Sequence, residues 1–559
     1  MVRKYSAACW ACLSLLASVG FAEARDSASD LSSSPPYAEP TRLPEVTVSA
    51  VQEQPPAPAR EATSVYGPDL SIMDTPRDVL PVSREELDTV MAQQVNDLVA
   101  FSPSVNPTEA TGNVVSEPVV RGLPATAFRN GMLVGFSSGG NWGPLLNINA
   151  DDSLDVVTGP VSIVFGPQEF AGGYVNEVTK QPFFDRFRGD AYYSLGMYDT
   201  NLWNIDIGGP VGKDKKLAYR FDYFGQEGYA PYNYYDGSYL DRECAYLALS
   251  WKPTEEVQVD WNGEIDRNSF LPYAGVNRPT QALIDSGLYQ SGPWIGYYTP
   301  PATAAQPFGR FHPGRGTPPP GSGYAVAWGP EVPIGGRANL FDTSLDSSRQ
   351  LYAVSQAIAT IRLNERLTLV NNTLFEYFQA NAAQPVPDPT WVVLPYGVDL
   401  ADRLEIRWEP EQKSSWFSQS VDGGLAFRFL SDEEYSGSWH PTSNQADMSK
   451  PITASDASLP VPYSLAISPA YDNPFLTDIP IPGYPGEYYN VDNFASTRCN
   501  FQEISPFLQD ILHFGEKATL FLGARLDAYF VDARPRPAPP PCSSAPPMTP
   551  PRRAPSCRS

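Results

Sequence analysis

The sequence predicts a mainly β protein in which a small α/β domain precedes a long series of antiparallel β-hairpins. Aromatic residues make up 12% of its 559 residues, and Gly (42) and Pro (58) are abundant, as expected for strands joined by many turns. The formal net charge of -24 argues against nucleic-acid binding, which needs a basic surface. After the N-terminal leader no apolar run reaches about 18 residues, so the sequence predicts no helical membrane span.

Residues 1–24 have the pattern of a secretory signal peptide. Arg3 and Lys4 form the positive start, an apolar or small stretch follows, and Ala22-Glu23-Ala24 fits a small-x-small cleavage site. The apolar run is too short for a membrane anchor. We therefore expect the mature chain to lie beyond the inner membrane.

Residues 25–65 are rich in Ser, Pro, Ala and Glu, and we expect them to be disordered. A β-prone hexamer lies within them. An exposed strand in a flexible segment is suited to adding onto the sheet edge of another protein. The hexamer consists of Glu45, Val46, Thr47, Val48, Ser49 and Ala50.

The small α/β domain is predicted from strand and cap signals. Val79–Val82 is a short strand, and Ser83 then caps a helix over Arg84–Met91, with Glu86 as its capping-box partner. A second, shorter helix is expected over Asn96–Phe101.

The stretch 153–182 carries the densest turn signals of the chain. A strand ends at Val157, and a strand over Tyr174–Thr179 alternates at period two. A further strand is expected over Val161–Phe165. The breaks between these strands are Gly159-Pro160, Gly166-Pro167 and Gly172-Gly173.

This ordered set closely resembles the plug-domain signature of the TonB-dependent outer-membrane receptors. The resemblance extends to a Pro-Ser-Val approach at 103–105 and to an Asn-Gly turn at 130–131. It implies a plug domain over residues 66–182 and a TonB box at residues 45–50. The matching plug residues are Asp74, Thr75, Pro76, Arg121, Gly122, Gly159, Pro160, Gly166, Gly172, Gly173, Asn176, Thr179 and Lys180.

One position departs from the family pattern. The residue before Gly159 is usually basic and helps to hold the plug in an acid-lined barrel, but here it is Thr158. The departure implies either that Arg121 carries more of this contact or that the plug is held more weakly. The alternative for Arg121 is a solvated surface arginine.

From residue 187 onward the pattern changes to hairpins. Trp203, Ile205 and Ile207 alternate with Asn204 and Asp206, and similar alternation recurs at 217–223 and 257–262. A barrel with a wet lumen requires polar residues inward and apolar residues outward. A soluble sandwich would also alternate, with its apolar face inward; the leader and the plug signature favour the barrel.

The links between the hairpins alternate between short and long. Tight turns are expected at 208–216, 252–255, 364–365 and 515–516, and long links at 268–348, 380–402 and 431–499. Outer-membrane barrels pair short periplasmic turns with long extracellular loops. We predict a partial antiparallel transmembrane β-barrel over residues 187–532, with roughly eleven strands or about half of a 22-strand barrel.

Residues 533–559 break the pattern. They are rich in Pro and Arg and contain no acidic residue, whereas the rest of the chain is strongly acidic. A proline-rich tail and a periplasmic linker are alternatives, but we favour a shifted reading frame and therefore a C-terminally truncated receptor. An open half-barrel would leave two unpaired strand edges in lipid, so this chain is not expected to insert as a closed barrel.

The first long link is rich in aromatic side chains that can grip a planar or chelated ligand. They can equally pack the loop against itself. The candidate ligand-binding residues are Tyr289, Trp294, Tyr297, Tyr298 and His312.

The resemblance implies an outer-membrane receptor for a scarce ligand, most similar to the ferric-siderophore branch and coupled to the TonB energy-coupling protein. Cobalamin, an oligosaccharide or another metal chelate remain alternatives, as does a soluble extracellular β-rich binding module such as an adhesin. No catalytic constellation, cofactor motif or metal-ligand cluster is predicted, so the chain is not expected to be an enzyme. The paired carboxylates Asp260 and Glu264 leave a carbohydrate hydrolase as a rival, although such pairs are more often lumen-facing charges.

Two cysteines lie within the predicted barrel, Cys244 and Cys499. They can pair in an oxidising compartment or remain free thiols, and the sequence does not decide between these alternatives.

Overall fold

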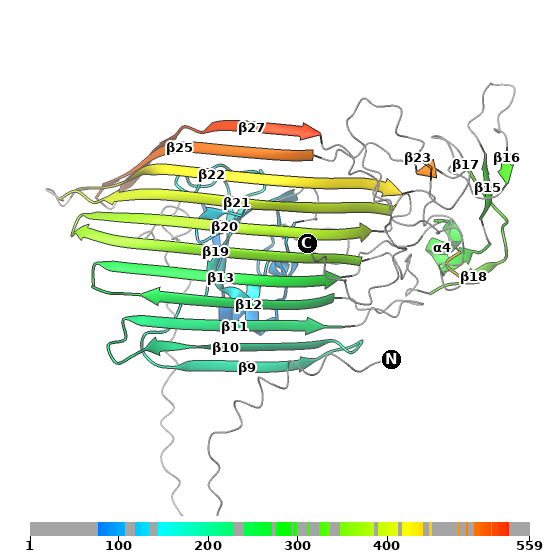
Figure 1. The fold of residues 1–559 in the computed structure, drawn as a ribbon, viewed down its shortest axis with the longest axis horizontal. Helices are drawn as coiled ribbons and strands as arrows, with labels where there is room; N and C mark the ends of the chain where they lie inside the picture. The colour runs from blue at the N-terminus through cyan, green and yellow to red at the C-terminus, as the bar shows by residue number, and fades with distance from the viewer. Residues whose placement is uncertain are drawn as a thin grey trace, which may run out of the picture. The chain divides into compact units, whose positions relative to one another are not determined.

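The large antiparallel sheet and the smaller N-terminal domain against it dominate the molecule (Figure 1). The computed structural model describes residues 77–106, 118–134, 143–228, 240–270, 276, 278–292, 294–298, 311–313, 323–335, 347–384, 390–411, 416–439, 447–449, 479–480, 488–489, 497–515 and 517–535. The predicted signal peptide, the hexamer at 45–50 and the motif residues Asp74, Thr75 and Pro76 lie outside these described residues.

The N-terminal domain is built on a five-stranded sheet with the order β1-β7-β8-β5-β6. β5 runs parallel to β8, and the other neighbours are antiparallel. Its strands are β1 (Asp78–Ser83), β5 (Thr126–Arg129), β6 (Met132–Leu133), β7 (Asp151–Thr158) and β8 (Tyr174–Thr179). A small second sheet follows the order β2-β3-β4, with β2 (Val105–Asn106), β3 (Val119–Val120) and β4 (Leu123–Pro124).

The helices of this domain begin where the sequence predicts. α3 (Arg84–Thr89) starts at Ser83, whose side chain accepts from the Glu86 amide while the Glu86 carboxylate accepts from the Ser83 amide, so the capping box is confirmed. α3 ends two residues earlier than predicted. The second helix is the 3-10 helix η3 (Val95–Ala100), and a short turn η4 (Ile148–Ala150) precedes β7.

The core of the domain lies between its sheet and these helices. Leu87 of α3 and Leu98 of η3 are fully buried with Leu154 of β7 and Val175 of β8. Burial of such side chains contributes about 1.5–3 kcal/mol each. The domain therefore has an apolar core of its own.

The predicted strand over Val161–Phe165 is wrong. These residues form an irregular turn between β7 and β8. Their backbone carbonyls accept hydrogen bonds from arginines of the large sheet instead of from a neighbouring strand: Arg525 Nη1 donates to Ile163 O (3.3 Å) and Arg403 Nη1 to Val164 O (3.1 Å).

The large sheet has twelve strands, close to the number predicted. The strands follow the order of the chain from β9 to β26, all antiparallel, and β27 pairs with β25 beside β26. They are β9 (Arg188–Leu195), β10 (Asn201–Val211), β11 (Leu217–Glu227), β12 (Leu240–Trp251), β13 (Val257–Phe270), β19 (Ser347–Asn364), β20 (Leu367–Gln384), β21 (Thr390–Trp408), β22 (Phe417–Trp439), β25 (Thr497–Phe514), β26 (Ala518–Arg525) and β27 (Ala528–Pro535).

The sheet is open. Among the described residues β9 pairs only with β10, and β26 and β27 pair only with β25, so the barrel is not closed. β27 runs three residues past Asp532, the predicted end of the β pattern, to Pro535.

The two faces of the sheet have opposite polarity. The face away from the N-terminal domain exposes large apolar side chains, whereas polar and charged side chains of the other face are buried. A soluble sandwich would bury its apolar face instead. The exposed apolar residues include Ile205, Ile265, Phe375, Leu404, Ile406, Leu425, Leu508 and Leu522, and the buried polar residues include Asn204, Asp222, Glu264, Gln356, Asn372, Arg403, Glu405, Glu503 and Gln509.

One of the predicted long links is wrong. Most of 380–402 is strand, because β20 continues to Gln384 and β21 begins at Thr390. The pairing of β20 with β21 is interrupted opposite Leu394 and Pro395, where the proline has no N–H to donate. The other two long links are confirmed, from the end of β13 to β19 and from the end of β22 to β25.

The first long link contains short elements of its own. They are α4 (Gln281–Ser286), β14 (Leu288–Gln290), β15 (Trp294–Tyr298), β16 (Phe311–Pro313), β17 (Gly323–Val326) and β18 (Glu331–Pro333). β14 pairs with β18, and β15 pairs with β16 and β17. The second long link contains β23 (Ile479–Pro480) and β24 (Tyr488–Tyr489). None of the helices in the described part of the chain is both long and apolar enough to cross a membrane.

Candidate functional site

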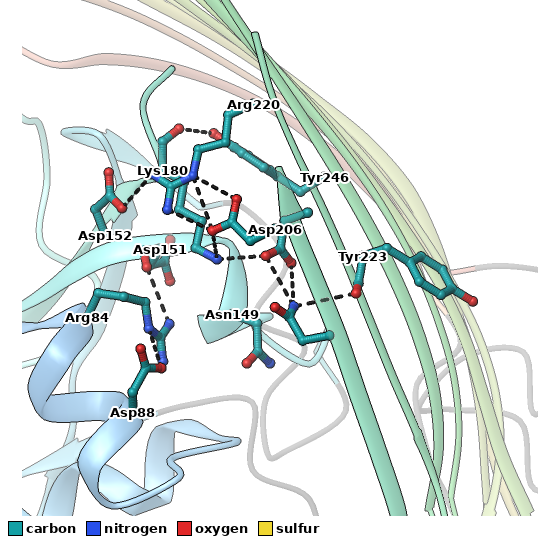
Figure 2. Close-up of polar contacts among 12 residues, drawn as sticks. Arg84, Asp88, Asn149, Asp151, Asp152, Lys180, Asp206, Arg220, Tyr223 and Tyr246 are labelled. Carbon is teal, nitrogen blue, oxygen red and sulfur yellow. Dashed lines mark hydrogen bonds and ion pairs between the residues drawn. The ribbon is translucent and has the colours of Figure 1, made fainter. Parts of the chain in front are cut away.

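The candidate functional site is the polar contact between the N-terminal domain and the large sheet. Figure 2 shows its centre, where Lys180 and Arg220 lie among carboxylates of both parts. Lys180 Nζ is 2.6 Å from Asp222 Oδ2 and 2.8 Å from Asp206 Oδ2. Arg220 Nη2 is 2.8 Å from Asp206 Oδ2, and its Nη1 is 2.9 Å from Asp152 Oδ1. We call these five residues the Lys180 cluster.

The backbone positions the central lysine. Lys180 directly follows β8, and its amide donates to Ala150 O (2.8 Å), while the Tyr246 hydroxyl of β12 donates to Lys180 O (2.7 Å) (Figure 2). The Lys180 side chain is 5% exposed and that of Asp222 is not exposed at all. The lysine therefore neutralises two buried carboxylates of adjacent strands and ties the end of β8 to the sheet.

The helix α3 lies beside this cluster. Arg84 Nε donates to Asp88 (2.8 Å) (Figure 2). Its Nη1 donates to Ile148 O (2.6 Å). A cavity of about 590 Å³ lies between α3, β9 and β10, and the side chains of Lys180, Arg220 and Tyr192 line it. The cavity thus reaches from the N-terminal domain to the edge strand of the sheet.

A second group of ion pairs surrounds Arg129 of β5. Arg129 Nη2 is 2.7 Å from Glu264 Oε2 on β13, and its Nη1 is 3.5 Å from Glu177 Oε2 on β8. These three side chains are nearly completely buried. The guanidinium therefore joins the domain sheet to the large sheet.

The Asn-Gly turn between β5 and β6 is also held by amides of the large sheet. Asn130 and Gly131 both have positive φ (44° and 75°), as a two-residue hairpin turn requires. The side-chain amide of Gln356 donates to Arg129 O (3.1 Å) and that of Asn372 donates to Asn130 O (3.1 Å). Asn130 Nδ2 in turn donates to Thr179 Oγ1 (3.0 Å), a predicted motif residue.

The remaining motif residues fix the path of the N-terminal domain. Asn176 Oδ1 accepts from the Gly131 amide (2.9 Å). A Cβ on Gly172 would lie 2.5 Å from Leu123 O, and a Cβ on Gly173, whose φ is +138°, would lie 2.4 Å from Val157 O. Backbone therefore passes too close for any side chain at these two glycines.

Gly159 and Gly166 lie at the two ends of the turn that contacts Arg403 and Arg525 of the large sheet. Their φ values are +134° and +123°, a conformation that side chains disfavour. Pro160 follows Gly159 in this turn. A Cβ on Gly166 would lie 3.7 Å from Arg525 Nη2, which also places the guanidinium against this turn.

Of the alternatives for Arg121, the structure favours the solvated surface arginine. Arg121 is exposed, and no ion pair of its side chain occurs in the described part of the chain. Arg121 and Gly122 have positive φ (55° and 75°) and form the turn between β3 and β4. Thr158, which stands where the family has a basic residue, is buried, and its hydroxyl lies 3.1 Å from Asp78 Oδ2. Arginines of the large sheet contact the turn that follows Thr158, at Ile163 and Val164.

The first long link is joined to the second by Tyr289. Its ring is fully buried beside Met448, whose amide donates to the Tyr289 hydroxyl (3.3 Å), and the Arg278 guanidinium lies 5.6 Å from the ring centre. This position favours loop packing for Tyr289. Trp294, Tyr297 and Tyr298 lie in β15 and His312 in β16, where Tyr297 pairs with His312; whether they contact a ligand stays a prediction.

The two paired carboxylates both have structural partners, and the two barrel cysteines are not bonded to each other. Glu264 is buried in an ion pair with Arg129, and Asp260 accepts hydrogen bonds from Gln258 (2.8 Å) and Ser250. Both carboxylates are thus occupied by structural partners. Cys244 in β12 and Cys499 in β25 are free thiols. No group of three or more His, Cys, Asp or Glu residues in the described ranges is arranged to hold a metal ion.

Arg129, Arg403 and Arg525 join the two parts but were not predicted as site residues, and Glu264 was named only as one of a carboxylate pair. The contacts that these arginines make between the two parts join residues more than 100 positions apart in the chain, as with Arg129 and Glu264 (135 residues apart). The available signal was the position of each residue on the polar side of an alternating strand. That pattern indicates which face of the sheet a side chain occupies, but not which residue of the other part it contacts.

Comparisons with known proteins bear on both parts of the molecule. Residues 71–173 match the family model of the TonB-dependent receptor plug domain. No curated protein matches the chain by sequence.

Several solved receptors share the fold. The closed form of the ferric-catecholate import receptor Fiu from E. coli has a TM-score of 0.58 at 14% identity, over 85% of this chain and 59% of Fiu. The pyoverdine outer-membrane receptor FpvA from Pseudomonas aeruginosa has a TM-score of 0.55 at 14% identity, over 85% of this chain and 62% of FpvA. BauA, the ferric preacinetobactin receptor from Acinetobacter baumannii, has a TM-score of 0.55 at 14% identity, over 85% and 60%. The chain thus spans less than two thirds of the length of each of these structures.

Proposed function

We propose that this chain, which carries a TonB-dependent receptor plug domain and has the fold of the receptors it resembles, is part of a receptor that acts in the active uptake of a scarce ligand across the outer membrane. The observation that carries the proposal is the seating of the plug on the polar face of the large sheet, hereafter the wall. Ion pairs of Lys180 and Arg129 join the two parts, while the opposite face of the wall is apolar. A wall of this polarity suits a lipid boundary outside and a polar lumen inside.

The ligand class that we propose is a ferric siderophore. Its support is the names of the structural neighbours, which are receptors for ferric preacinetobactin, ferric catecholates and pyoverdine. The iron would arrive inside its chelator, so the protein would recognise the chelate and not bare metal. The aromatic residues of β15 and His312 of β16 are the proposed contacts on the outer loops.

The proposed energy input is strand addition of residues 45–50 to the TonB energy-coupling protein. A force on this segment would reach β1 before the rest of the plug. β1 is the edge strand of the plug sheet and pairs only with β7 among the described strands, whereas β7 and β8 carry contacts to the wall through Asp152 and Lys180. β1 and α3 are therefore expected to separate before the anchored strands.

Uptake by cells tests this function. A receptor that contains this chain and the further strands needed to close its sheet would be expressed in a Gram-negative host that lacks its own ferric-siderophore receptors, and outer-membrane fractions would be checked first for the protein. Accumulation of radioactive iron would then be measured for catecholate, hydroxamate and citrate chelates, with cobalamin and a maltodextrin as other ligand classes. We expect uptake of at least one iron chelate.

A variant pair separates TonB-driven uptake from leakage. Val48→Pro removes a donor from the hexamer and should abolish uptake, whereas Ala57→Pro, in a stretch already rich in proline, should leave it unchanged. Equal uptake by both variants would refute the energy-coupling role. Uptake of cobalamin or maltodextrin alone would refute the siderophore class, and absence of binding to every ligand would refute the receptor function.

A further inference from the structure

Buried carboxylates crowd around Arg129 at the junction of plug and wall. Asp151 of β7 and Glu177 of β8 belong to the plug, and Glu264 belongs to β13 of the wall. Each of these four side chains is at most 3% exposed. The guanidinium contacts Glu264 at 2.7 Å and Glu177 at 3.5 Å, so one cation faces three carboxylates.

Several oxygens of these carboxylates have no donor. Within the part of the chain that the structure describes, both Asp151 oxygens, Oε1 of Glu177 and Oε1 of Glu264 have no hydrogen-bond partner. An ionised carboxylate in such a place is strongly disfavoured, and it takes up a proton unless a cation compensates its charge.

The surrounding groups do not supply that compensation. Arg84 of α3 gives its hydrogen bonds to Asp88 and to backbone carbonyls, including that of Asp151. Tyr246 donates to a backbone carbonyl, and Tyr352 donates to Glu376 (2.5 Å). The titratable or charged groups that face the carboxylates are Arg84 (α3), Arg129 (β5), Cys244 and Tyr246 (β12), Glu264 and Asp266 (β13), Tyr352 (β19) and Glu376 (β20).

We propose that Asp151 and Glu177 form a buried proton-binding site, and that the seated plug holds a proton there which it releases when the plug leaves the wall. The site goes beyond ligand uptake, because it makes the seating of the plug depend on pH. The ligand is a proton rather than a metal ion, since no arrangement able to hold a metal occurs among the described residues.

The direction of the pH effect follows from burial. Desolvation raises the pKa of Glu177 to about 7 from its ordinary 4.5, with Arg129 opposing and Glu264 adding to the rise. Desolvation, together with the charge of Glu177, also raises the pKa of Asp151. The seated plug therefore binds more protons than the released plug, so the Glu177 proton makes release easier as the pH rises from about 4.5 to about 7. One proton changes the release equilibrium tenfold per pH unit, or roughly 300-fold over this window.

Infrared difference spectroscopy of the full chain in detergent micelles tests the site directly. A protonated carboxyl has a C=O stretching band that an ionised one lacks. We expect this band in the unmodified protein at about pH 6 and its loss by about pH 8. The band should be smaller in the double variant Asp151→Asn/Glu177→Gln and unchanged in the control Asp190→Asn, which removes an exposed carboxyl of β9. The proposal would be overturned if the unmodified protein had no such band, or if the band of the double variant were equal to that of the unmodified protein.

Amide hydrogen exchange of β7 and β8 provides the second measurement. After correction for the intrinsic pH dependence of exchange, the unmodified protein should open up to roughly 100-fold more readily at about pH 8 than at about pH 5. The double variant should show no such dependence. If added sodium or calcium ions instead suppressed opening in the unmodified protein and not in the double variant, the site would bind a cation and the proton proposal would be wrong.

Discussion

Replacing Lys180 by Met should weaken the seating of the plug strongly. The substitution keeps most of the aliphatic volume but removes the cation from between Asp206 and Asp222, at 2.8 and 2.6 Å. At an effective dielectric constant of about 20 each contact is worth roughly 6 kcal/mol before desolvation. The desolvation of three buried ions offsets much of this, and removal of one partner from a buried pair costs about 3–5 kcal/mol.

The charge that remains behind determines this cost. Asp206 keeps its ion pair with Arg220, whereas Asp222 keeps the hydrogen bonds from the side-chain amide of Asn204 (3.1 Å) and has no second cation within the Lys180 cluster. The double variant Lys180→Met/Asp222→Asn removes the orphaned charge and should recover more than half of the loss. Lys213→Met, at an exposed position in the turn after β10, serves as the matched control and should change nothing measurable.

Hydrogen exchange of the β8 amides in the full chain measures the effect. A loss of 3–5 kcal/mol corresponds to roughly 200- to 5,000-fold faster opening of the plug, because each 1.4 kcal/mol is a factor of ten. The reasoning would be refuted if Lys180→Met exchanged at the unmodified rate. It would also be refuted if the double variant opened as fast as the single one, since the cost would then not arise from Asp222.

Three further substitutions test other contacts by the same exchange measurement. Gly173→Ala brings a Cβ within 2.4 Å of Val157 O and should destabilise the plug by about 3 kcal/mol or more. The control Gly122→Ala has open space around it and should cost only about 1–2 kcal/mol of backbone strain. Equal costs for the two variants would contradict the argument from close approach. Arg403→Met leaves the carbonyls of Gly131 and Val164 without this donor and should cost about 1–3 kcal/mol for each; unchanged exchange in the turn 162–166 would show that the contacts are unimportant. Ser83→Ala removes the helix cap and should cost about 1 kcal/mol, visible only in α3, and faster exchange across the whole plug would contradict a local cap.

Local chemistry explains which parts of the fold could be predicted. The capping box at Ser83 and the strand over Tyr174–Thr179 are confirmed because their signals lie within a few residues of one another. The alternation in β10 is confirmed because each side chain faces either the plug or the outside. In these cases tertiary contacts agree with local preference.

The predictions failed where distant contacts replaced local ones. The β-branched run at 161–165 has the composition of a strand, yet its carbonyls accept hydrogen bonds from arginines of the wall and not from a neighbouring strand. No periodicity in the sequence indicates that these arginines replace a strand partner. The link at 380–402 contains four prolines, but three of them fall between β20 and β21, and Pro395 is accommodated at a gap in the pairing. Arg121 was considered as an electrostatic contact because it belongs to the Arg-Gly motif. Its side chain is exposed because the residue lies in the turn after β3.

The contact of Arg403 and Arg525 with the turn at 162–166 recognises backbone. Both guanidinium groups donate to main-chain carbonyls, at Val164 and Ile163, and every amino acid has such a carbonyl. Side chains at these two positions can therefore change without loss of the hydrogen bonds, provided that the chain keeps its path. That path depends on the positive φ values of Gly159 and Gly166. These two hydrogen bonds therefore constrain the path of the chain at Ile163 and Val164 and not the identity of the two side chains.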